Sequence, residues 1–363
     1  MRICLIGKNL TNLVLAYNLA SKNLNVDIFF DKKNQIKFSQ RTIGISKNNF
    51  DFLLKMHKQS KIIAWPIKNI KIYNEKNNFK ELFEFKNKNT ENFFLVKHSN
   101  IFNSFYKICS KNKNIKFKII KNSTNLDSII NDKKYSIIIN SETNNQLTKK
   151  YFNLKVEKNY DSIAYTGIID HKKIKNNQAT QIFTKYGPLA FLPISNSKTS
   201  VVFSIFKKFK LEDIKIFELI KKYNLIYKIK KKNKLEKFTL KYLMLKNYTY
   251  KNILCFGDLL HKIHPLAGQG FNMNIRDIKT LSTLIDEKIE LGLQLDESLL
   301  HDFQYKTKHL NYLFGTGIDF IHEFFQLDNK SNNLLSESAF NILKKNKLFN
   351  KYATLVADTG LKF

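Results

Sequence analysis

The sequence predicts an α/β protein in which a parallel-sheet domain is interleaved with an antiparallel-sheet domain and followed by a helical C-terminus. Three observations support this fold class. The N-terminus has the pattern strand, glycine turn, helix, strand, and residues 155–245 are rich in strand-like apolar runs. Residues 257–277 concentrate glycine, proline and arginine, which the rest of the chain largely avoids.

The first thirty residues have the pattern of a βαβ unit. Ile3–Ile6 form a short apolar run, Gly7 follows, and apolar residues then recur at helical spacing over Leu10–Ala20. A second run, Val26–Phe30, ends at Asp31, 24 residues after Gly7. An acid near that offset binds the adenosine ribose in dinucleotide-binding folds. We therefore predict a Rossmann-like nucleotide-binding domain.

The glycine fingerprint of this unit is incomplete. The pattern G-x-G-x-x-G reads Gly7-Lys8-Asn9-Leu10-Thr11-Asn12, so asparagine replaces the second and third glycines. Because Asn tolerates a left-handed backbone, Asn9 is expected to keep the turn, although its side chain lies where a pyrophosphate approaches. Asn12 is expected to loosen the contact between helix and strand. A βαβ unit that binds no nucleotide stays open as the alternative.

The remaining elements follow from apolar periodicity. Strands are predicted within 65–85 and at Ile115–Ile120, Tyr135–Ile139, Ile163–Ile169, Gln181–Thr184, Thr199–Ile205 and Asn252–Phe256, and helices at Ile101–Ser110 and Leu211–Lys234. The strand-rich part suits an antiparallel sheet that covers a substrate. The expected division is 1–62, 97–154 and 246–330 for the nucleotide-binding domain, 63–96 and 155–245 for the antiparallel domain, and 331–363 for C-terminal helices.

The formal net charge of +32 does not by itself indicate a nucleic-acid binder. Lys occurs in every segment together with Asn, Ile and Phe, whereas Arg, which best makes bidentate base and phosphate contacts, is nearly absent. We therefore expect no nucleic-acid partner. Lysine clusters favour an anionic membrane surface, by about 1 kcal/mol per residue. The runs Lys207–Lys210 and Lys228–Lys234 are interpreted first as solvated faces.

Cysteine use favours a reducing compartment. Cys4, Cys109 and Cys255 have no metal-ligand spacing, and two of them lie in apolar runs, where a thiol acts as a small hydrophobic group. No apolar run reaches about 18 residues, so no membrane span is expected, and polar residues interrupt any signal-peptide pattern. We predict a cytoplasmic protein with no metal site. Residues 334–349 mix apolar residues with lysines and suit either core packing or a membrane surface.

Residues 257–277 combine glycines with an acid at the end of an apolar strand. Asp258 lies at the carboxyl end of that strand, where a carboxylate accepts hydrogen bonds from ribose or ribityl hydroxyls. Ala267-Gly268-Gln269-Gly270 then opens a helix that continues to about Leu284. Its glycines allow close approach of a planar ring, and its amides and dipole favour negative charge on that ring.

The other polar residues of this stretch have simpler interpretations. His261 and His264 are interpreted as hydrogen-bonding groups of the turn rather than as bases. Arg276, next to Asp277, is interpreted as a member of a surface or helix ion pair.

This stretch resembles the second flavin fingerprint of the FAD-dependent aromatic-ring hydroxylases, in the ubiquinone-biosynthesis branch (2-polyprenyl-6-methoxyphenol hydroxylase-like). The matching residues are Gly257, Asp258, His261, His264, Pro265, Ala267, Gly268, Gln269, Gly270, Asn272 and Asp277. Three other segments resemble motifs of that family in the same order: Gln40–Ser46 with its Arg41, Gly187–Pro193, and Gly315–Phe325 with Asp319 as its acid.

The resemblance implies FAD as the cofactor. It assigns cofactor binding to Gly7, Asn9, Asp31, Arg41, Asp258, Pro265, Ala267, Gly268, Gln269, Gly270 and Asn272, and it assigns no catalytic residue. The chain departs from the family where the central Ala-Asp-Gly motif reads Asn140-Ser141-Glu142. It also departs at Leu260 and Asn274, where the family has Ala and Gly.

The resemblance further implies a flavin-dependent monooxygenase that hydroxylates a polyprenylated phenol, with NAD(P)H as reductant and O2 as co-substrate. The cofactor supplies the oxidative chemistry, while the protein positions the reactants and excludes water. The resemblance also implies a ubiquinone-biosynthesis complex as a possible partner and a peripheral position of the protein at the inner membrane. The incomplete fingerprints support a second hypothesis, a non-catalytic, flavin-poor homologue that serves as a lipid- or quinone-binding subunit. A nucleic-acid binder is a third, supported by charge alone.

Overall fold

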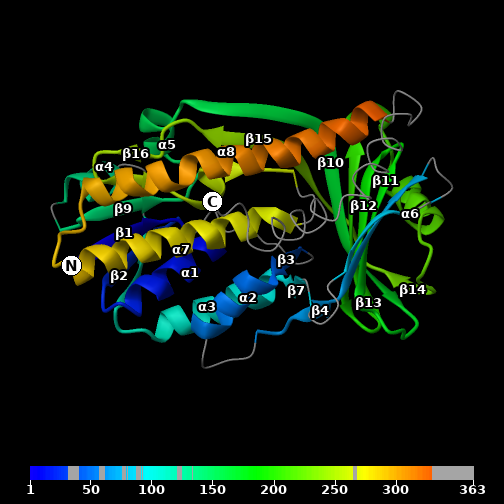
Figure 1. The fold of residues 1–363 in the computed structure, drawn as a ribbon, viewed down its shortest axis with the longest axis horizontal. Coiled ribbons are helices and arrows are strands. Elements are labelled where there is room, and N and C mark those ends of the chain that lie inside the picture. Colours follow the sequence, from blue (N-terminus) through cyan, green and yellow to red (C-terminus); the bar gives the residue numbers. More distant parts are fainter. Residues whose placement is uncertain are drawn as a thin grey trace.

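The computed structural model describes residues 1–31, 41–56, 62–75, 79, 81–86, 91, 93–120, 125–132, 134–264 and 268–328. The predicted C-terminal helices at 331–363, the segment 334–349, and the predicted site residues Pro265 and Ala267 lie outside the described residues. Figure 1 shows a parallel-sheet part with helices on the left and a large antiparallel sheet on the right. The predicted fold class is confirmed.

The first part is built on a six-stranded sheet. Its order is β16-β17-β9-β1-β2-β8, in which five strands are parallel and β16 is antiparallel to β17. β1 and β9 are buried almost throughout, as expected for a parallel sheet with both faces covered. The strands are β1 (Arg2–Ile6), β2 (Asn25–Phe30), β8 (Ile115–Ile119), β9 (Ile137–Asn140), β16 (Thr249–Tyr250) and β17 (Ile253–Cys255).

The helices that follow β1 and β9 begin close to the carboxyl ends of these two strands. α1 and α7 pack against each other, and α1 also contacts α3 (Figure 1). The helices are α1 (Leu10–Ala20), α2 (Lys47–Met56), α3 (His98–Lys111), α4 (Asn125–Asn131), α5 (Gln146–Tyr151) and α7 (Gln269–Glu290). The predicted helix at Leu10–Ala20 has the same bounds in the structure, and Gly7 precedes it with φ +111°.

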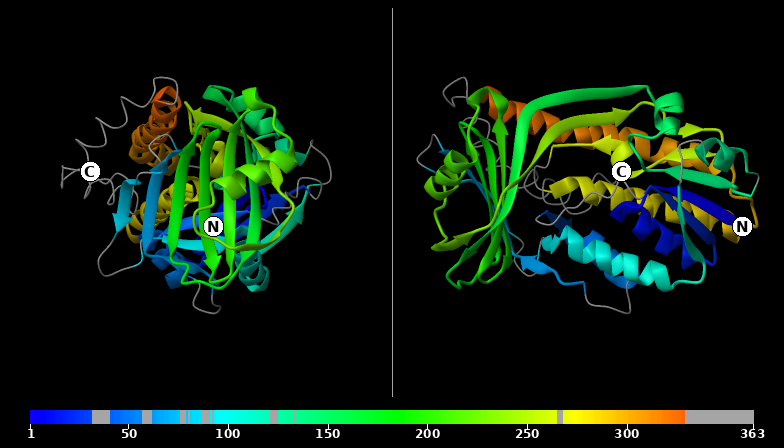
Figure 2. Two further views of the ribbon diagram at one scale, coloured as in Figure 1. Left: turned by 90° about the vertical axis from the view of Figure 1, so that its right-hand side faces the viewer. Right: turned by 180° about the vertical axis from the view of Figure 1, so that it is seen from behind.

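The second part is a nine-stranded sheet in the order β18-β15-β10-β13-β12-β11-β5-β6, with β14 paired to β10. Its neighbours are antiparallel except for β5 and β11, which are parallel. α6 (Asp213–Lys222) packs on the face turned away from the parallel sheet (Figure 2). The strands are β5 (Asn69–Asn74), β6 (Glu81–Lys86), β10 (Lys155–His171), β11 (Gln178–Thr184), β12 (Gly187–Ser195), β13 (Lys198–Phe206), β14 (Ile229–Lys232), β15 (Glu236–Leu245) and β18 (His261–Lys262).

A small sheet and a long helix connect the two parts. β3 (Thr42–Ser46), β7 (Phe93–Lys97) and β4 (Trp65–Ile67) form a three-stranded antiparallel sheet. α8 (Glu297–Asp328) contacts strands of both large sheets, and the two views of Figure 2 show it alongside both. Among the described residues, no helix is long and apolar enough to cross a membrane. The predicted domain boundaries stay a prediction.

The helix predicted over Leu211–Lys234 is wrong in its second half. α6 ends at Lys222, and 229–232 form β14, which pairs antiparallel with β10. Asn224 explains the break, because its side-chain oxygen accepts hydrogen bonds from the backbone N–H groups of Ile226 and Tyr227. Such a local side-chain bond competes with a helix for the backbone and favours a turn.

A buried ionic cluster lies inside the parallel sheet. Asp27, in the middle of β2, is fully buried, and its carboxylate accepts hydrogen bonds from Arg2 at 2.9 Å, Lys118 at 2.7 Å and the Tyr135 hydroxyl at 2.7 Å. Burial opposes its ionisation, but the hydrogen bonds of Lys118 and Tyr135 and the charges of Lys118 and Arg2 outweigh burial, so the pKa of Asp27 is lowered. The cluster ties together β1, β2, β8 and the start of β9.

We predict that Asp27→Asn lowers the free energy of unfolding by about 3 kcal/mol, because three donors lose a buried charged acceptor. Asp51→Asn is the control: its pair with Lys47 is exposed and is expected to contribute less than about 1 kcal/mol. Urea unfolding of both variants measures the difference. Because the folded pKa of Asp27 is lowered, its contribution is complete above about pH 4 and is lost as the pH falls through that pKa. A gap between wild type and Asp27→Asn that does not narrow in acid contradicts this account.

Candidate functional site

The turn after β17 presents an exposed carboxylate. Gly257 has φ +66°, and a Cβ at this position would lie 3.3 Å from the Thr11 Cγ2 atom, so the glycine lets the turn pack on the first turn of α1. Asp258 follows it and is exposed. Its Oδ1 atom accepts a hydrogen bond of 3.0 Å from Asn274, a residue of α7. The predicted ribityl-binding acid therefore has a fixed orientation at the carboxyl end of a parallel strand.

Asn274 has a role that the sequence alone did not reveal. It stands where the resembled family has Gly, and the side chain is buried between α7 and α1. Its amide nitrogen donates both to Asp258 and to the Thr11 hydroxyl at 3.1 Å. Asn274, which departs from the family pattern, therefore orients Asp258, the acid that the same pattern predicts to bind the cofactor.

The N-terminus of α7 is packed directly on the backbone of β3. Gly268 caps the helix with φ +64°, and an added Cβ would lie 3.1 Å from the backbone nitrogen of Gly44. The first turn of α7 contains no acidic residue. Free amides at such an end favour a negatively charged group. Gly270, in the same turn, faces open space.

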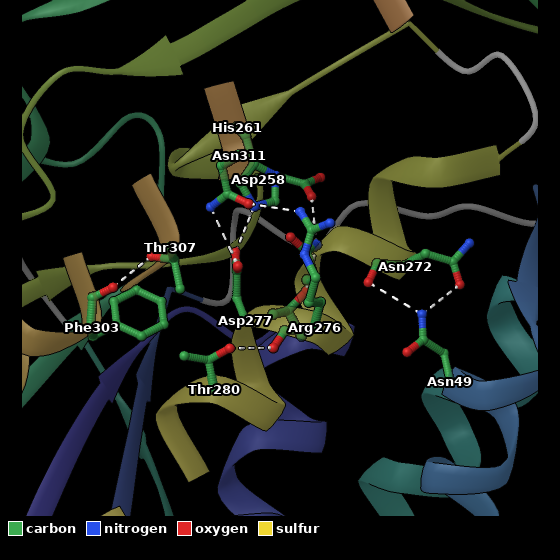
Figure 3. Close-up of polar contacts among 12 residues, drawn as sticks. Asn49, Asp258, His261, Asn272, Arg276, Asp277, Thr280, Phe303, Thr307 and Asn311 are labelled. Atoms are coloured by element: carbon green, nitrogen blue, oxygen red, sulfur yellow. Dashed lines mark hydrogen bonds and ion pairs between the residues drawn. The ribbon is translucent and has the colours of Figure 1, made fainter. Parts of the chain in front are cut away.

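Asn272 links α7 to β3 and α2. Its nitrogen donates to the Gly44 carbonyl at 2.9 Å, and its oxygen accepts from the Ser46 backbone N–H at 3.0 Å. The same oxygen accepts from Asn49 at 3.1 Å (Figure 3). These bonds hold β3 beside Gly268. A direct contact of Asn272 with a cofactor stays a prediction, as does that of the buried Gln269.

Arg41 and His98 lie on the same side as Asp258. The His98 backbone N–H donates to the Arg41 carbonyl at 2.9 Å, which places the start of α3 beside β3. Burial and, to a smaller extent, the charge of Arg41 lower the pKa of His98 to about 4, against the opposing effect of the charge of Asp258. His98 is therefore neutral at pH 7, and Arg41 is the cation of this corner. No sequence pattern singled out His98.

A buried network behind the site corrects one interpretation. His261 bonds to Asp277 at 2.6 Å, and Arg276 donates to Asn311 at 2.9 Å (Figure 3). Among the described residues the side chain of Arg276 therefore bonds to a neutral amide, and the surface or helix ion pair expected for it is wrong. Asn311 in turn donates to Asp277 at 3.3 Å. The structural interpretation of His261 agrees with this geometry, and the network joins the β18 turn to α7 and α8.

His264 departs from its expected role. Within the described residues neither of its ring nitrogens has a hydrogen-bond partner, and the ring stacks on His322 of α8 with centroids 4.2 Å apart. Nearby, Asp319 of the segment resembling the later family motif pairs with Lys158 at 3.4 Å. Gly187, at the start of the Gly-Pro motif, has φ +130°, and a Cβ there would lie 2.0 Å from the Ser204 carbonyl oxygen.

The fingerprint turn differs from the expected one. Asn9 is not left-handed but extended, with φ −119°, and its side-chain oxygen caps α1 by accepting from the Asn12 backbone N–H at 3.0 Å. Asn12 does not loosen the helix, because its buried amide donates to the carbonyls of Ile6 and Gly7 at 3.1 and 2.8 Å. Asp31 lies at the end of β2.

These residues fit the ring and ribityl chain of FAD better than they fit its pyrophosphate. The exposed Asp258, the free end of α7 and the charge of Arg41 suit a ribityl chain and an electron-rich ring. At the other end, Gly7 keeps a glycine-only φ of +111°, but side chains of 141–142 fill the space above it. At the flavin end Asp258 is exposed and Gly270 faces open space among the described residues, whereas at the pyrophosphate end side chains of 141–142 fill the space above Gly7.

The sequence of residues 211–301 matches the model of an FAD binding domain. The chain is 35% identical over 80 residues to a mitochondrial ubiquinone biosynthesis monooxygenase of Dictyostelium discoideum, a match covering 22% of this chain and 16% of that protein. It is 21% identical over 241 residues to the enzyme of that name in Schizosaccharomyces pombe, covering 53% and 50%. The matches thus span half or less of these relatives.

Solved structures show the fold over nearly the whole chain. The p-nitrophenol 4-monooxygenase of Pseudomonas putida aligns with a TM-score of 0.78 at 9% identity, covering 99% of this chain and 98% of that one. A probable FAD-dependent monooxygenase from Pseudomonas aeruginosa aligns with a TM-score of 0.68 at 13% identity, covering 90% and 97%. The resemblance to the FAD-dependent hydroxylases and their ubiquinone-biosynthesis branch is confirmed, and FAD is the cofactor that the matched domain binds.

We predict that Gly268→Ala destabilises the protein more than Gly292→Ala. Both glycines have a left-handed φ, which costs about 1–2 kcal/mol for alanine, but only position 268 also forces a Cβ against β3. Gly270→Ala, in open space with an ordinary φ, is expected to leave stability unchanged or raise it. Thermal or urea unfolding of the three variants ranks them. Equal losses at 268 and 292 would show that the packing on Gly44 carries no energy.

Proposed function

We propose that the chain is a flavin-dependent monooxygenase that hydroxylates a polyprenylated phenol in ubiquinone biosynthesis, with NAD(P)H as reductant. The observation that carries this proposal is the corner between Gly257 and Gly268: an exposed acid at a strand end faces the same site as a glycine-capped helix end. The matches to ubiquinone biosynthesis monooxygenases and to an FAD binding domain over this same segment support it.

The chain's own residues supply binding and orientation. Asp258, held by Asn274, would accept hydrogen bonds from hydroxyls of the ribityl chain. The amides at the start of α7 and the charge of Arg41 would stabilise negative charge on the flavin ring. Bound FAD supplies the oxidative chemistry that amino-acid side chains lack.

A second candidate function, that of a non-catalytic subunit, is favoured by the side chains that fill the space above Gly7. A homologue that holds flavin poorly and serves as a lipid- or quinone-binding subunit of a biosynthetic complex needs no open path above Gly7. The filling of that space by 141–142 supports this alternative. The two functions differ in whether a hydroxylated product forms.

We predict that purified protein, supplied with FAD, NAD(P)H, O2 and a short-chain prenylated phenol, forms a product heavier by one oxygen atom. Asp258→Ala is expected to weaken flavin binding about 10- to 100-fold, because it removes charged hydrogen bonds. Asp286→Ala is the control, since this acid lies on the outer side of α7 and pairs with Lys22. Mass spectrometry and flavin fluorescence provide the readouts. Flavin binding without any oxygenated product supports the non-catalytic alternative.

We also propose peripheral contact with an anionic membrane, motivated by the +32 charge and by the apolar tail of the proposed substrate. The protein is expected to float with vesicles that contain anionic lipid at low salt, and to be released as salt screens the interaction. Vesicles of zwitterionic lipid serve as the control. Equal binding to both vesicle types would contradict an electrostatic attachment.

A further inference from the structure

Two departures from the glycine fingerprint and one from the Ala-Asp-Gly motif meet at one atom, the hydroxyl oxygen of Ser141. The Ser141 hydroxyl accepts hydrogen bonds of 2.7 Å from the side-chain nitrogens of Asn9 and Asn12, and it donates to the Ile6 carbonyl at 3.0 Å. Positions 9 and 12 stand where the fingerprint has Gly, and Ser141 stands where the resembled family has Asp. The substitutions therefore form one closed hydrogen-bonded cluster between α1, β1 and β9.

Glu142 extends this cluster over Gly7. A Cβ added to Gly7 would lie 2.6 Å from the Glu142 Oε1 atom and 2.7 Å from the Ser141 Oγ atom. In dinucleotide-binding folds, glycines at this turn leave room for the pyrophosphate to approach the backbone. Here the carboxylate of Glu142 lies in that room.

The backbone of Glu142 is fixed on both sides. Its N–H donates to the Asn140 side chain at 3.1 Å, and its carbonyl accepts from the Thr148 hydroxyl at 2.6 Å. Asn145 also donates to Asn140, at 2.8 Å, and its side-chain oxygen caps α5 through the Thr148 N–H. Because α5 holds this turn, the carboxylate can leave the space above Gly7 only by rotation of its own side chain.

The charges around Glu142 are unfavourable for a pyrophosphate. Burial raises the pKa of Glu142, and the charge of Asp31 at the end of β2 adds to that effect. Lys8, the cation of the same turn, lies over the rings of Phe30 and Tyr106, 4.3 and 5.2 Å from their centroids. Like charges placed together disfavour binding in a recognition site, so the acid opposes a phosphate both by its volume and by its charge.

We propose that Glu142 is a specificity-determining residue that occupies the pyrophosphate position and removes most of the binding energy that the ADP half of FAD would contribute. The flavin half of the site, around Asp258 and Gly268, then binds flavins with nearly the same affinity whether or not they carry phosphates. This inference rests on the proposed flavin site, so its test measures that site separately.

The test compares FAD with riboflavin, which lacks both phosphates, by quenching of flavin fluorescence. The wild type is expected to bind the two with dissociation constants within about threefold of each other, and Glu142→Ala is expected to tighten FAD about tenfold or more and leave riboflavin within about twofold. Glu142→Gln separates charge from volume, and we expect it to tighten FAD by a smaller factor. Glu157→Ala, an acid of β10 paired with Lys155 and Lys241, is the control.

The outcomes are distinguishable. Wild-type protein that binds FAD about a hundredfold more tightly than riboflavin overturns the inference, and so does a folded Glu142→Ala with unchanged FAD affinity. In either case the proposed function stands. If no variant binds either flavin, the inference and the proposed function fail together. Circular dichroism confirms folding, and if Glu142→Ala does not fold, Glu142→Gln decides the result.

Discussion

The close approach of Gly268 to Gly44 is the contact on which the candidate site depends. Only a residue without a side chain allows the end of α7 to lie against the backbone of β3 in a left-handed conformation. Asn272 then fixes the two elements through three hydrogen bonds to 44–49. With α7 in this position, Asn274 reaches Asp258, and the helix end and the carboxylate face one site.

Residues depart from the resembled family pattern at both the flavin end and the pyrophosphate end of the site, but the consequences differ. At the flavin end, Asn274 replaces a glycine of the resembled pattern and gains bonds to Asp258 and Thr11. At the other end, Asn9, Asn12 and Ser141 gain bonds to one another and close the turn around Gly7. Both changes introduce buried asparagines whose amide nitrogens donate hydrogen bonds to neighbouring groups. Only the second change occupies space that a dinucleotide uses.

The sequence predicted the elements whose signal is local. The βαβ unit, the bounds of α1 and the turn at Gly257–Asp258 follow from apolar spacing and glycine. The second half of the Lys-rich helix was missed because Asn224 redirects the backbone and β10 offers a partner strand. The roles of His98 and Asn274 were missed because they arise from contacts between residues far apart in the chain. The conformation of Asn9 depends equally on Ser141, which is distant in sequence.

The central claim is that the corner between Gly257 and Gly268 binds the ring of a flavin. The most direct measurement is the amount of flavin that the purified protein retains after saturation with excess cofactor, quantified after denaturation. The account predicts an equimolar amount, with an absorption spectrum that differs from that of free flavin. Protein that retains no flavin at saturation, while folded by circular dichroism, would contradict the account.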